Sequence, residues 1–412
     1  MSFHRSTSLI FIIFLTFINF FLQRKRRREN QENYPPSPPS LPIIGHLHLL
    51  KPPQHRAFHR LSQKHGPIFS FRMGSHPMPY MNASPKNDIV LANRPVLIID
   101  KHLFYNNSTM ITSSYGDHWR NIRHICAIEI FSSARLNAFL NISKDKVKHL
   151  LHKLSQQSSS RQDGYFAKNI LVTMVAGKRY CARQFKEIIN QVTKYAGVPN
   201  PGEIWPILNW IGYEKKMMMK LGERTDVFLQ GLIDEHQMKK TTTELDAQLG
   251  QERLVDEPDI LKLPYLQCIV SETLRLCPPP PMLIPHVSSN ECTIEGFKVL
   301  RDTTVLVNAW AIQRDPNLWD DPESFKPERF ESGKDLSHKF MPFGLGRRAC
   351  PGAGLAQRVV GLTLGSLIQC FERERVSEKV VDMTEGEGLT MPKLVPLEAM
   401  CKVRTVVKKV LY

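Results

Sequence analysis

The chain has 412 residues, of which 42% are hydrophobic, so it is long enough to bury a large core. Its formal net charge of +16 favours an acidic partner or surface, but no nucleic-acid-binding motif accompanies that charge. The eight cysteines form no CxxC pair and lack the density of a disulfide scaffold, which suits a reducing compartment. These features argue against a small secreted domain, and nucleic-acid binding is supported by charge alone.

The amino terminus carries an uncharged apolar segment from Ser6 to Leu22. The segment is slightly short of the ~20 residues that usually cross a bilayer, but it lies within the observed range. The basic run from Arg24 to Arg28 follows it, which predicts that the body of the protein stays on the cytosolic side. A cleaved signal peptide is the alternative, although no small-residue cleavage site follows Leu22. The sequence therefore predicts a membrane anchor over residues 1–23.

A proline-rich run, PPSPPSLPIIG, occupies residues 35–45. Such a run predicts a stiff polyproline spacer, with an unstructured linker as the alternative. Together with the basic residues before it, the run forms a predicted hinge over residues 24–45, so the globular body is expected to begin at residue 46.

The body begins with short elements. A short amphipathic helix is expected around Ala57 and should end at Gly66. The alternation from Ile68 to Met73 predicts a strand, and Gly74 to Pro79 is expected to be the turn into a second strand.

Apolar residues at helical spacing predict a helix from Asp117 to Phe131. Trp119 and Arg123 are four residues apart and therefore share one face of it. Taken by itself, such a pair is more often a stacked surface contact. Further apolar stripes predict helices over 136–154, 185–192, 213–240 and 264–277.

The segment FGLGRRACPG, from Phe343 to Gly352, places Cys350 among glycines and arginines, directly before an apolar helix predicted over 353–371. Glycines let the backbone bend tightly and approach a flat macrocycle. A cysteine thiolate can ligate haem iron, Arg348 can reach a haem propionate, and Phe343 can shield the sulfur. The backbone N–H groups of the turn and the dipole of the next helix both favour a thiolate charge. A Gly/Arg loop around a buried, inert cysteine is the alternative for a cysteine considered alone.

This segment resembles the haem-binding signature of the cytochrome P-450 superfamily at five positions, which are Phe343, Gly346, Arg348, Cys350 and Gly352. The order of apolar anchor, basic cluster and proline hinge is similar to that of microsomal members. The stretches YGDHWRNIR, AIEIFSS, FLQGLIDEH and LVDEPDI resemble the plant branch of isoflavone 2'-hydroxylase-like enzymes. The resemblance implies a mainly α fold with small β-sheets (α+β), as a haem domain over residues 46–412. It also implies haem as cofactor, with Cys350 as the only protein ligand to the iron.

The resemblance assigns roles outside the cysteine loop as well. It implies that three side chains contact haem propionates, namely Trp119, Arg123 and His286, although a plain strand-end histidine is the alternative for His286. It implies that a second set forms a buried charge network that holds the cysteine loop, namely Glu272, Arg275 and Arg329. A Glu and an Arg three residues apart are by themselves a weak signal, because any exposed helix can hold such a pair.

One part typical of the family is missing, namely a long distal helix with an acid–threonine pair that relays protons. It should lie between FLQGLIDEH and LVDEPDI, yet only three threonines separate Lys240 from Glu244. A helix that spans a ~30 Å body needs about 20 residues, so it cannot fit there. We therefore assign no catalytic residue and expect a cytochrome P-450 fold that lacks this helix. The sequence predicts an internal deletion near 240–244, with smaller ones near 83–86 and 160–169.

Two functions of different class follow. In the first, the chain is a haem-thiolate monooxygenase in the endoplasmic reticulum membrane that hydroxylates a small apolar or phenolic plant metabolite of flavonoid or isoflavonoid type. It would take electrons from NADPH through NADPH-cytochrome P-450 reductase, whose acidic face the basic charge would suit. In the second, it is a truncated, non-catalytic product with weak or no haem binding. No nucleic-acid partner is expected.

Overall fold

The computed structural model describes residues 33–74, 76–81, 88–97, 107–156, 253–331, 336, 338–375, 384–386, 388–391, 394, 399–404 and 406–407. The predicted anchor, the helices predicted over 185–192 and 213–240, and the three predicted deletion points lie outside these residues. Within the described ranges, no helix is long and apolar enough to cross a membrane.

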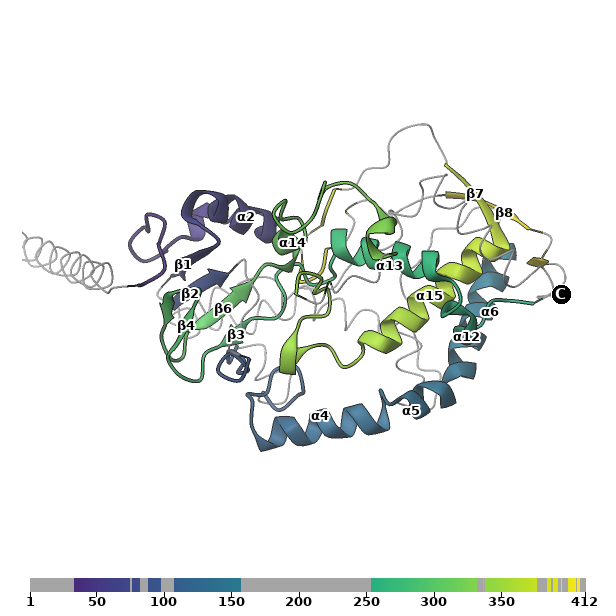
Figure 1. The fold of residues 1–412 in the computed structure, drawn as a ribbon, viewed down its shortest axis with the longest axis horizontal. Coiled ribbons are helices and arrows are strands. Elements are labelled where there is room, and N and C mark those ends of the chain that lie inside the picture. The colour runs from purple at the N-terminus through teal and green to yellow at the C-terminus, as the bar shows by residue number, and fades with distance from the viewer. Residues whose placement is uncertain are drawn as a thin grey trace, which may run out of the picture.

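A four-stranded mixed sheet forms one end of the molecule (Figure 1). Strands β1 (Ile68–Met73) and β2 (His76–Met81) form an antiparallel hairpin, with Phe69 opposite Tyr80. Strand β6 (Thr304–Val307) runs parallel to β2 and antiparallel to β3 (His286–Val287). The prediction for β1 is confirmed. The turn predicted over Gly74 to Pro79 is wrong, because β2 already begins at His76.

Helix α2 (Gln54–His65) packs on this sheet through an aromatic cluster. The Phe58 ring stacks on Tyr80 with a centroid distance of 5.2 Å, and its edge meets Phe71 at 5.0 Å. The helix ends at Gly66, which has φ +97° and donates its N–H to the Ser62 carbonyl. The predicted stop is therefore confirmed, and the helix is longer at its amino-terminal end than the apolar residues alone indicated.

The proline-rich segment lies against the sheet in its described part. The Pro36 carbonyl accepts a hydrogen bond from the backbone of Ser70, and Gly45 bridges to Met73. Gly45 has φ +63°, and a Cβ there would lie 2.3 Å from the carbonyl oxygen of Arg72. Residues 36–45 are thus bound to strand β1, and do not stand free of the body as a polyproline spacer would.

Three helices run along one side of the molecule, namely α4 (Asp117–Glu129), α5 (Ser133–Ala138) and α6 (Leu140–Gln156). The prediction of α4 is confirmed, but only Trp119 is buried on it, and Ile125 and Ile128 are exposed by 57% and 48%. The stripe predicted as one helix over 136–154 is two helices that meet at Phe139. The apolar repeat continues through that break, so periodicity could not reveal it.

The largest part of the core joins α6 to α12 (Glu257–Ile260), α13 (Pro264–Leu276) and α15 (Ala353–Cys370). Leu151, Leu266 and Ile368 are among its fully buried side chains. Pro264 occupies the first turn of α13, where its missing N–H costs nothing. The predictions of α13 and α15 are confirmed, and α15, with 18 residues, is the longest helix in the described ranges.

Short elements complete the described fold. Helix α14 (Ala309–Ile312) packs beside α2, and the single-turn helices are η1 (Leu47–Leu49), η3 (Pro327–Phe330) and η4 (Gly346–Arg348). Two further two-stranded antiparallel sheets pair β4 (Cys292–Ile294) with β5 (Phe297–Val299), and β7 (Phe371–Arg375) with β8 (Ala399–Val403).

Candidate haem-thiolate site

The cysteine loop is a tight turn that ends at Gly352, the residue directly before α15. Gly344 and Gly346 have φ values of +70° and +65°, a region that glycine enters without a Cβ penalty. The Cys350 N–H donates to the carbonyl of Phe343 at 2.9 Å, which closes the loop. The Cys350 side chain is exposed, whereas Phe343 is partly buried against the main core. The loop therefore presents the sulfur outward while its base is anchored in the helical core.

The amino-terminal end of α15 lies directly behind the sulfur. A Cβ on Gly352 would lie 3.8 Å from the Cys350 Sγ and 3.3 Å from Cε1 of Phe131, so the aromatic ring and the sulfur flank the same point of the backbone. The positive end of the helix dipole favours a negative charge at this position. Phe131 was not predicted as a site residue, since only its place at the end of α4 distinguishes it in the sequence.

Arg348 of the loop packs against Trp119 of α4, and Arg123 of the same helix binds the loop backbone. Arg348 donates from Nε to the Ala92 carbonyl at 2.6 Å, and its guanidinium carbon lies 4.4 Å from the Trp119 ring centroid. Trp119 donates its indole N–H to the Met110 carbonyl at 3.1 Å. Arg123 donates from Nη1 to the carbonyl of Ala349 at 2.7 Å, which joins α4 to the residue before the cysteine. The structure thus brings the predicted pair on α4 into contact with the predicted loop.

His286 lies at the edge of the same region, on β3. Its Nδ1 is 2.6 Å from the Leu91 carbonyl, so that nitrogen carries the proton and donates it. Burial lowers the pKa of His286 to about 4, and the positive charges of Arg94 and Arg348 act in the same direction. The imidazole is therefore neutral at pH 7.

Arg94 is a buried charge that the sequence analysis did not single out. Its Nη1 donates to the carbonyls of Ile284 and Pro285, at 2.8 and 2.7 Å, and its Nε is buried with no hydrogen-bond partner. Burial, assisted by the charge of Arg348, lowers the pKa of Arg94 to about 9. One sequence signal could have marked it: a charged residue directly before Pro95, after the apolar run from Ile89 to Ala92.

The charges around the loop fit an anionic cofactor. Burial also lowers the pKa of Arg348 to about 10, with the charge of Arg123 as the second cause. In the part of the chain that the structure describes, none of Arg94, Arg123 and Arg348 pairs with a carboxylate. Arg94 is buried and Arg123 and Arg348 are half-buried, and cations held close together away from water are costly unless a counter-charge lies between them. The two propionates of a haem would supply that charge, and the exposed sulfur of Cys350 would supply the axial ligand, so the residues present fit the group.

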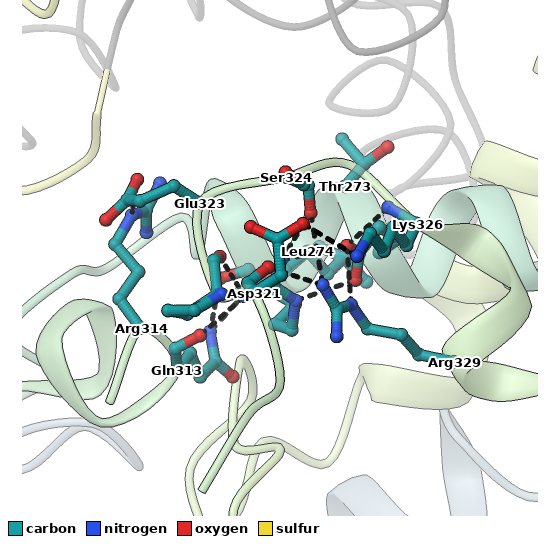
Figure 2. Close-up of polar contacts among 12 residues, drawn as sticks. Thr273, Leu274, Gln313, Arg314, Asp321, Glu323, Ser324, Lys326 and Arg329 are labelled. Carbon is teal, nitrogen blue, oxygen red and sulfur yellow. Dashed lines mark hydrogen bonds and ion pairs between the residues drawn. The ribbon is translucent and has the colours of Figure 1, made fainter. Parts of the chain in front are cut away.

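A second cluster of polar and charged groups joins α13 to the segment from Gln313 to Arg329 (Figure 2). Arg275 donates from Nε and Nη2 to the two carboxylate oxygens of Glu272, at 2.7 and 2.8 Å, and both side chains are fully buried. The Glu272 Oε1 also accepts from the backbone of Lys326 at 2.8 Å and from Arg329 Nε at 3.3 Å. The structure therefore brings Glu272, Arg275 and Arg329 together, as the resemblance implied, and joins α13 to η3.

Gln313 connects this cluster to the cysteine loop, and the sequence analysis missed it. Its carbonyl accepts from Arg275 Nη1 at 2.7 Å, and its side-chain Nε2 donates to the Arg275 carbonyl at 2.9 Å. Its Oε1 accepts the backbone N–H of Met341, two residues before Phe343, at 2.9 Å. A buried glutamine of this kind has no sequence signal, since its partners are backbone groups from distant parts of the chain.

Comparison with known proteins places these observations in context. The family model described as "Cytochrome P450" matches residues 35–243 and 234–397. Cytochrome P-450 81Q32 of Catharanthus roseus is 43% identical over 459 aligned positions, which cover 90% of this chain and 91% of that protein. The isoflavone 2'-hydroxylase of Glycyrrhiza echinata is 38% identical, with 90% of this chain and 92% of that protein covered. The (+)-piperitol/(+)-sesamin synthase CYP81Q2 of Sesamum radiatum is 41% identical, with 90% of each chain covered.

The fold has a solved counterpart as well. A zebra fish cytochrome P-450, in a structure with abiraterone, superposes with a TM-score of 0.70 at 21% identity, covering 86% of this chain and all of that one. This likeness shows that the fold is the same. The 459-position alignment to 81Q32 is longer than the whole chain of 412 residues, so it places gaps within this chain. The family model also matches the chain in two separate parts, which overlap at residues 234–243. This break is consistent with the predicted internal truncation.

Proposed function

The chain belongs to the cytochrome P-450 family of monooxygenases, and from this premise we propose that Cys350 is the thiolate ligand of its haem and that the enzyme hydroxylates a small phenolic plant metabolite. The observation that carries the assignment is the turn that presents the exposed Cys350 sulfur at the amino-terminal end of α15. A haem held by a thiolate supplies the oxygen chemistry of this family, because the ligand donates electron density to the iron.

The protein's part is to hold the cofactor and protect its ligand. Arg348, Arg123 and His286 would bind the propionates, with the Trp119 ring packed against the Arg348 guanidinium. The neutral imidazole of His286 gives its only proton, on Nδ1, to the Leu91 carbonyl, so its Nε2 can only accept a hydrogen bond. His286 would therefore contact a propionate only in that group's protonated, carboxylic acid form. Phe343 and Phe131 would keep water from the sulfur, and Gly346 and Gly352 give the backbone its close approach.

The substrate class is inferred from the relatives. Their names include isoflavone hydroxylases and a (+)-piperitol/(+)-sesamin synthase, whose substrates are aromatic plant compounds. We infer a flavonoid-like or lignan-like substrate for this chain. NADPH-cytochrome P-450 reductase is the proposed electron donor, and the apolar segment from Ser6 to Leu22 is the proposed anchor in the endoplasmic reticulum membrane.

One specific observation favours a second candidate, a truncated product without turnover. The family match is split at 234–243, where the sequence offers no distal helix and no acid–threonine pair. Without that helix, the chain lacks both a proton relay and one wall of the substrate pocket.

The carbon-monoxide difference spectrum of the reduced, purified chain tests the ligand assignment. A thiolate-type Soret band is expected for the chain as written and should vanish in Cys350→Ser, because a hydroxyl does not replace the thiolate. Cys126→Ser is the matched control and should keep the band. A thiolate band that survives in Cys350→Ser would show that another cysteine is the ligand. Turnover is a separate measurement, namely product formed per NADPH consumed with a reductase present.

A further inference from the structure

Residues 88–94 connect three parts of the site. The Leu91 carbonyl accepts from His286, and the Ala92 carbonyl accepts from Arg348, both at 2.6 Å. The Asn93 side-chain oxygen accepts the backbone N–H of Tyr115 at 3.0 Å, at the entry to α4. The segment is thus hydrogen-bonded to β3, to the cysteine loop and to the loop before α4.

Asp88, at the start of this segment, is bound directly to the cysteine loop. Its Oδ1 accepts the backbone N–H of Arg347 at 3.0 Å, and its Oδ2 lies 3.3 Å from the Nε of the same arginine. The carboxylate fits because Gly346 has no side chain: a Cβ there would lie only 2.4 Å from Asp88 Oδ1. Gly346 therefore serves two needs at once, a positive φ and room for the carboxylate.

The backbone N–H groups of Arg347, Ala349 and Cys350 all have hydrogen-bond acceptors, and among these three that of Arg347 is the one whose acceptor lies outside the loop. The N–H groups of Ala349 and Cys350 donate within the loop, to the carbonyls of Gly346 and Phe343. The N–H of Arg347 instead goes to a side chain 259 residues away in sequence. Asp88 thus binds the backbone of the turn three residues before the sulfur.

We propose that Asp88 is a positioning residue that holds the Gly346–Arg348 turn, and through it Cys350, in the geometry that ligates iron. The part of the proposal that concerns iron rests on the proposed function above. The hydrogen bond to the backbone is the main contribution. The ion pair with Arg347 adds little, because the two side chains are 45% and 39% exposed and water screens the charges.

The proposal distinguishes two substitutions. Asp88→Asn keeps an oxygen that can accept the Arg347 N–H, so it should behave much like the wild type. Asp88→Ala removes the acceptor and should free the turn. Asp117→Ala is the matched control. Like Asp88, Asp117 forms an ion pair with an arginine, in its case Arg120, but it does not bind the backbone of the cysteine loop.

The test uses the full chain and two measurements. Hydrogen exchange at the Arg347 amide should be about tenfold faster in Asp88→Ala than in wild type, Asp88→Asn and Asp117→Ala. The rate at which Cys350 is alkylated, measured by mass spectrometry of its peptide, should differ from the wild-type rate in Asp88→Ala alone. Neither measurement requires haem, so both report on the turn even if the chain proves unable to bind the cofactor.

The third measurement adds haem and reads the carbon-monoxide spectrum. In Asp88→Ala, part of the thiolate-type band should be replaced by the band of the non-thiolate form. Asp88→Asn should keep the thiolate-type band at its wild-type height. If wild type shows no thiolate band, the proposed function fails while the exchange data still decide the role of Asp88. If Asp88→Ala exchanges like wild type and keeps the full band, Asp88 does not position the loop and the proposal is overturned.

Discussion

The guanidinium of Arg275 donates to both carboxylate oxygens of Glu272, and neither side chain has any exposed surface. The same arginine donates to the carbonyls of Gln313 and Pro322, at 2.7 and 2.8 Å. The pair therefore serves as a junction: it joins helix α13 to the loop before η3, and through Gln313 to the backbone at Met341. Met341 lies two residues before Phe343, so this chain of hydrogen bonds connects the buried pair to the start of the cysteine loop.

Arg275→Ala should destabilise the protein by roughly 3–5 kcal/mol, because it leaves the Glu272 carboxylate buried without its main partner. Arg275→Lys should not rescue it, since an ammonium cannot reproduce the planar two-point contact. Urea unfolding and haem content of the purified variants measure both effects. Arg120→Ala removes an exposed arginine from an ion pair and is the control, with a change within about 0.5 kcal/mol expected. Equal stability of Arg275→Ala and Arg120→Ala would contradict the buried role.

Acid should weaken the fold through His286. Its pKa of about 4 in the folded protein lies below the ordinary value of 6.5, so between these pH values the unfolded chain binds more protons. The free energy of unfolding should therefore fall as the pH is lowered through that window, by up to about 3 kcal/mol from this group.

Comparison with His286→Gln isolates this contribution. Burial also lowers the pKa of His46 and His59, so these groups contribute to the same acid trend in both proteins. Stability curves measured from pH 7 to pH 4 should be shallower for His286→Gln than for wild type. Parallel curves would show that His286 titrates normally in the folded protein.

Gly45→Ala should destabilise the junction between the proline-rich segment and β1 by at least about 2 kcal/mol, because it combines a positive φ with a backbone clash. The new Cβ would lie 2.3 Å from the carbonyl oxygen of Arg72, which no side-chain rotation can relieve. Gly116→Ala is the control, since a Cβ at Gly116 has no heavy atom within 4 Å and its φ is 179°. Thermal unfolding compares the two, and a similar melting temperature for both would mean that residues 36–45 detach at little cost.

Turnover should require residues that the chain lacks. Inserting the distal-helix segment of a relative such as 81Q32 between Lys240 and Glu244 should raise the yield of hydroxylated product per NADPH, because it supplies a proton relay and a pocket wall. The chain as written should consume NADPH mainly without product. Tight coupling of NADPH consumption to product in the chain as written would disprove this expectation, and the insertion with its acid and threonine changed to alanine is the matched control.

Much of this protein could be predicted from local sequence. The boundaries of α13 and α15 follow from prolines and apolar spacing, and strand β1 follows from alternation, because these signals act within a few residues. The cysteine loop could be predicted as well, since its glycines, arginine and cysteine are adjacent in the chain. Here the residue types alone specify a tight turn that presents a sulfur.

Only the tertiary structure decided which distant groups complete the site. Asp88, Arg94 and Gln313 act on backbone groups that are 28 to 259 residues away, and no periodicity or motif records such a partner. The exposed isoleucines of α4 have a similar reason: apolar spacing shows which side of a helix is apolar, but not whether a neighbour covers it. Sequence determined the turn that carries the sulfur, and long-range packing determined what holds that turn in place, because buried polar groups must find their partners wherever the fold brings them.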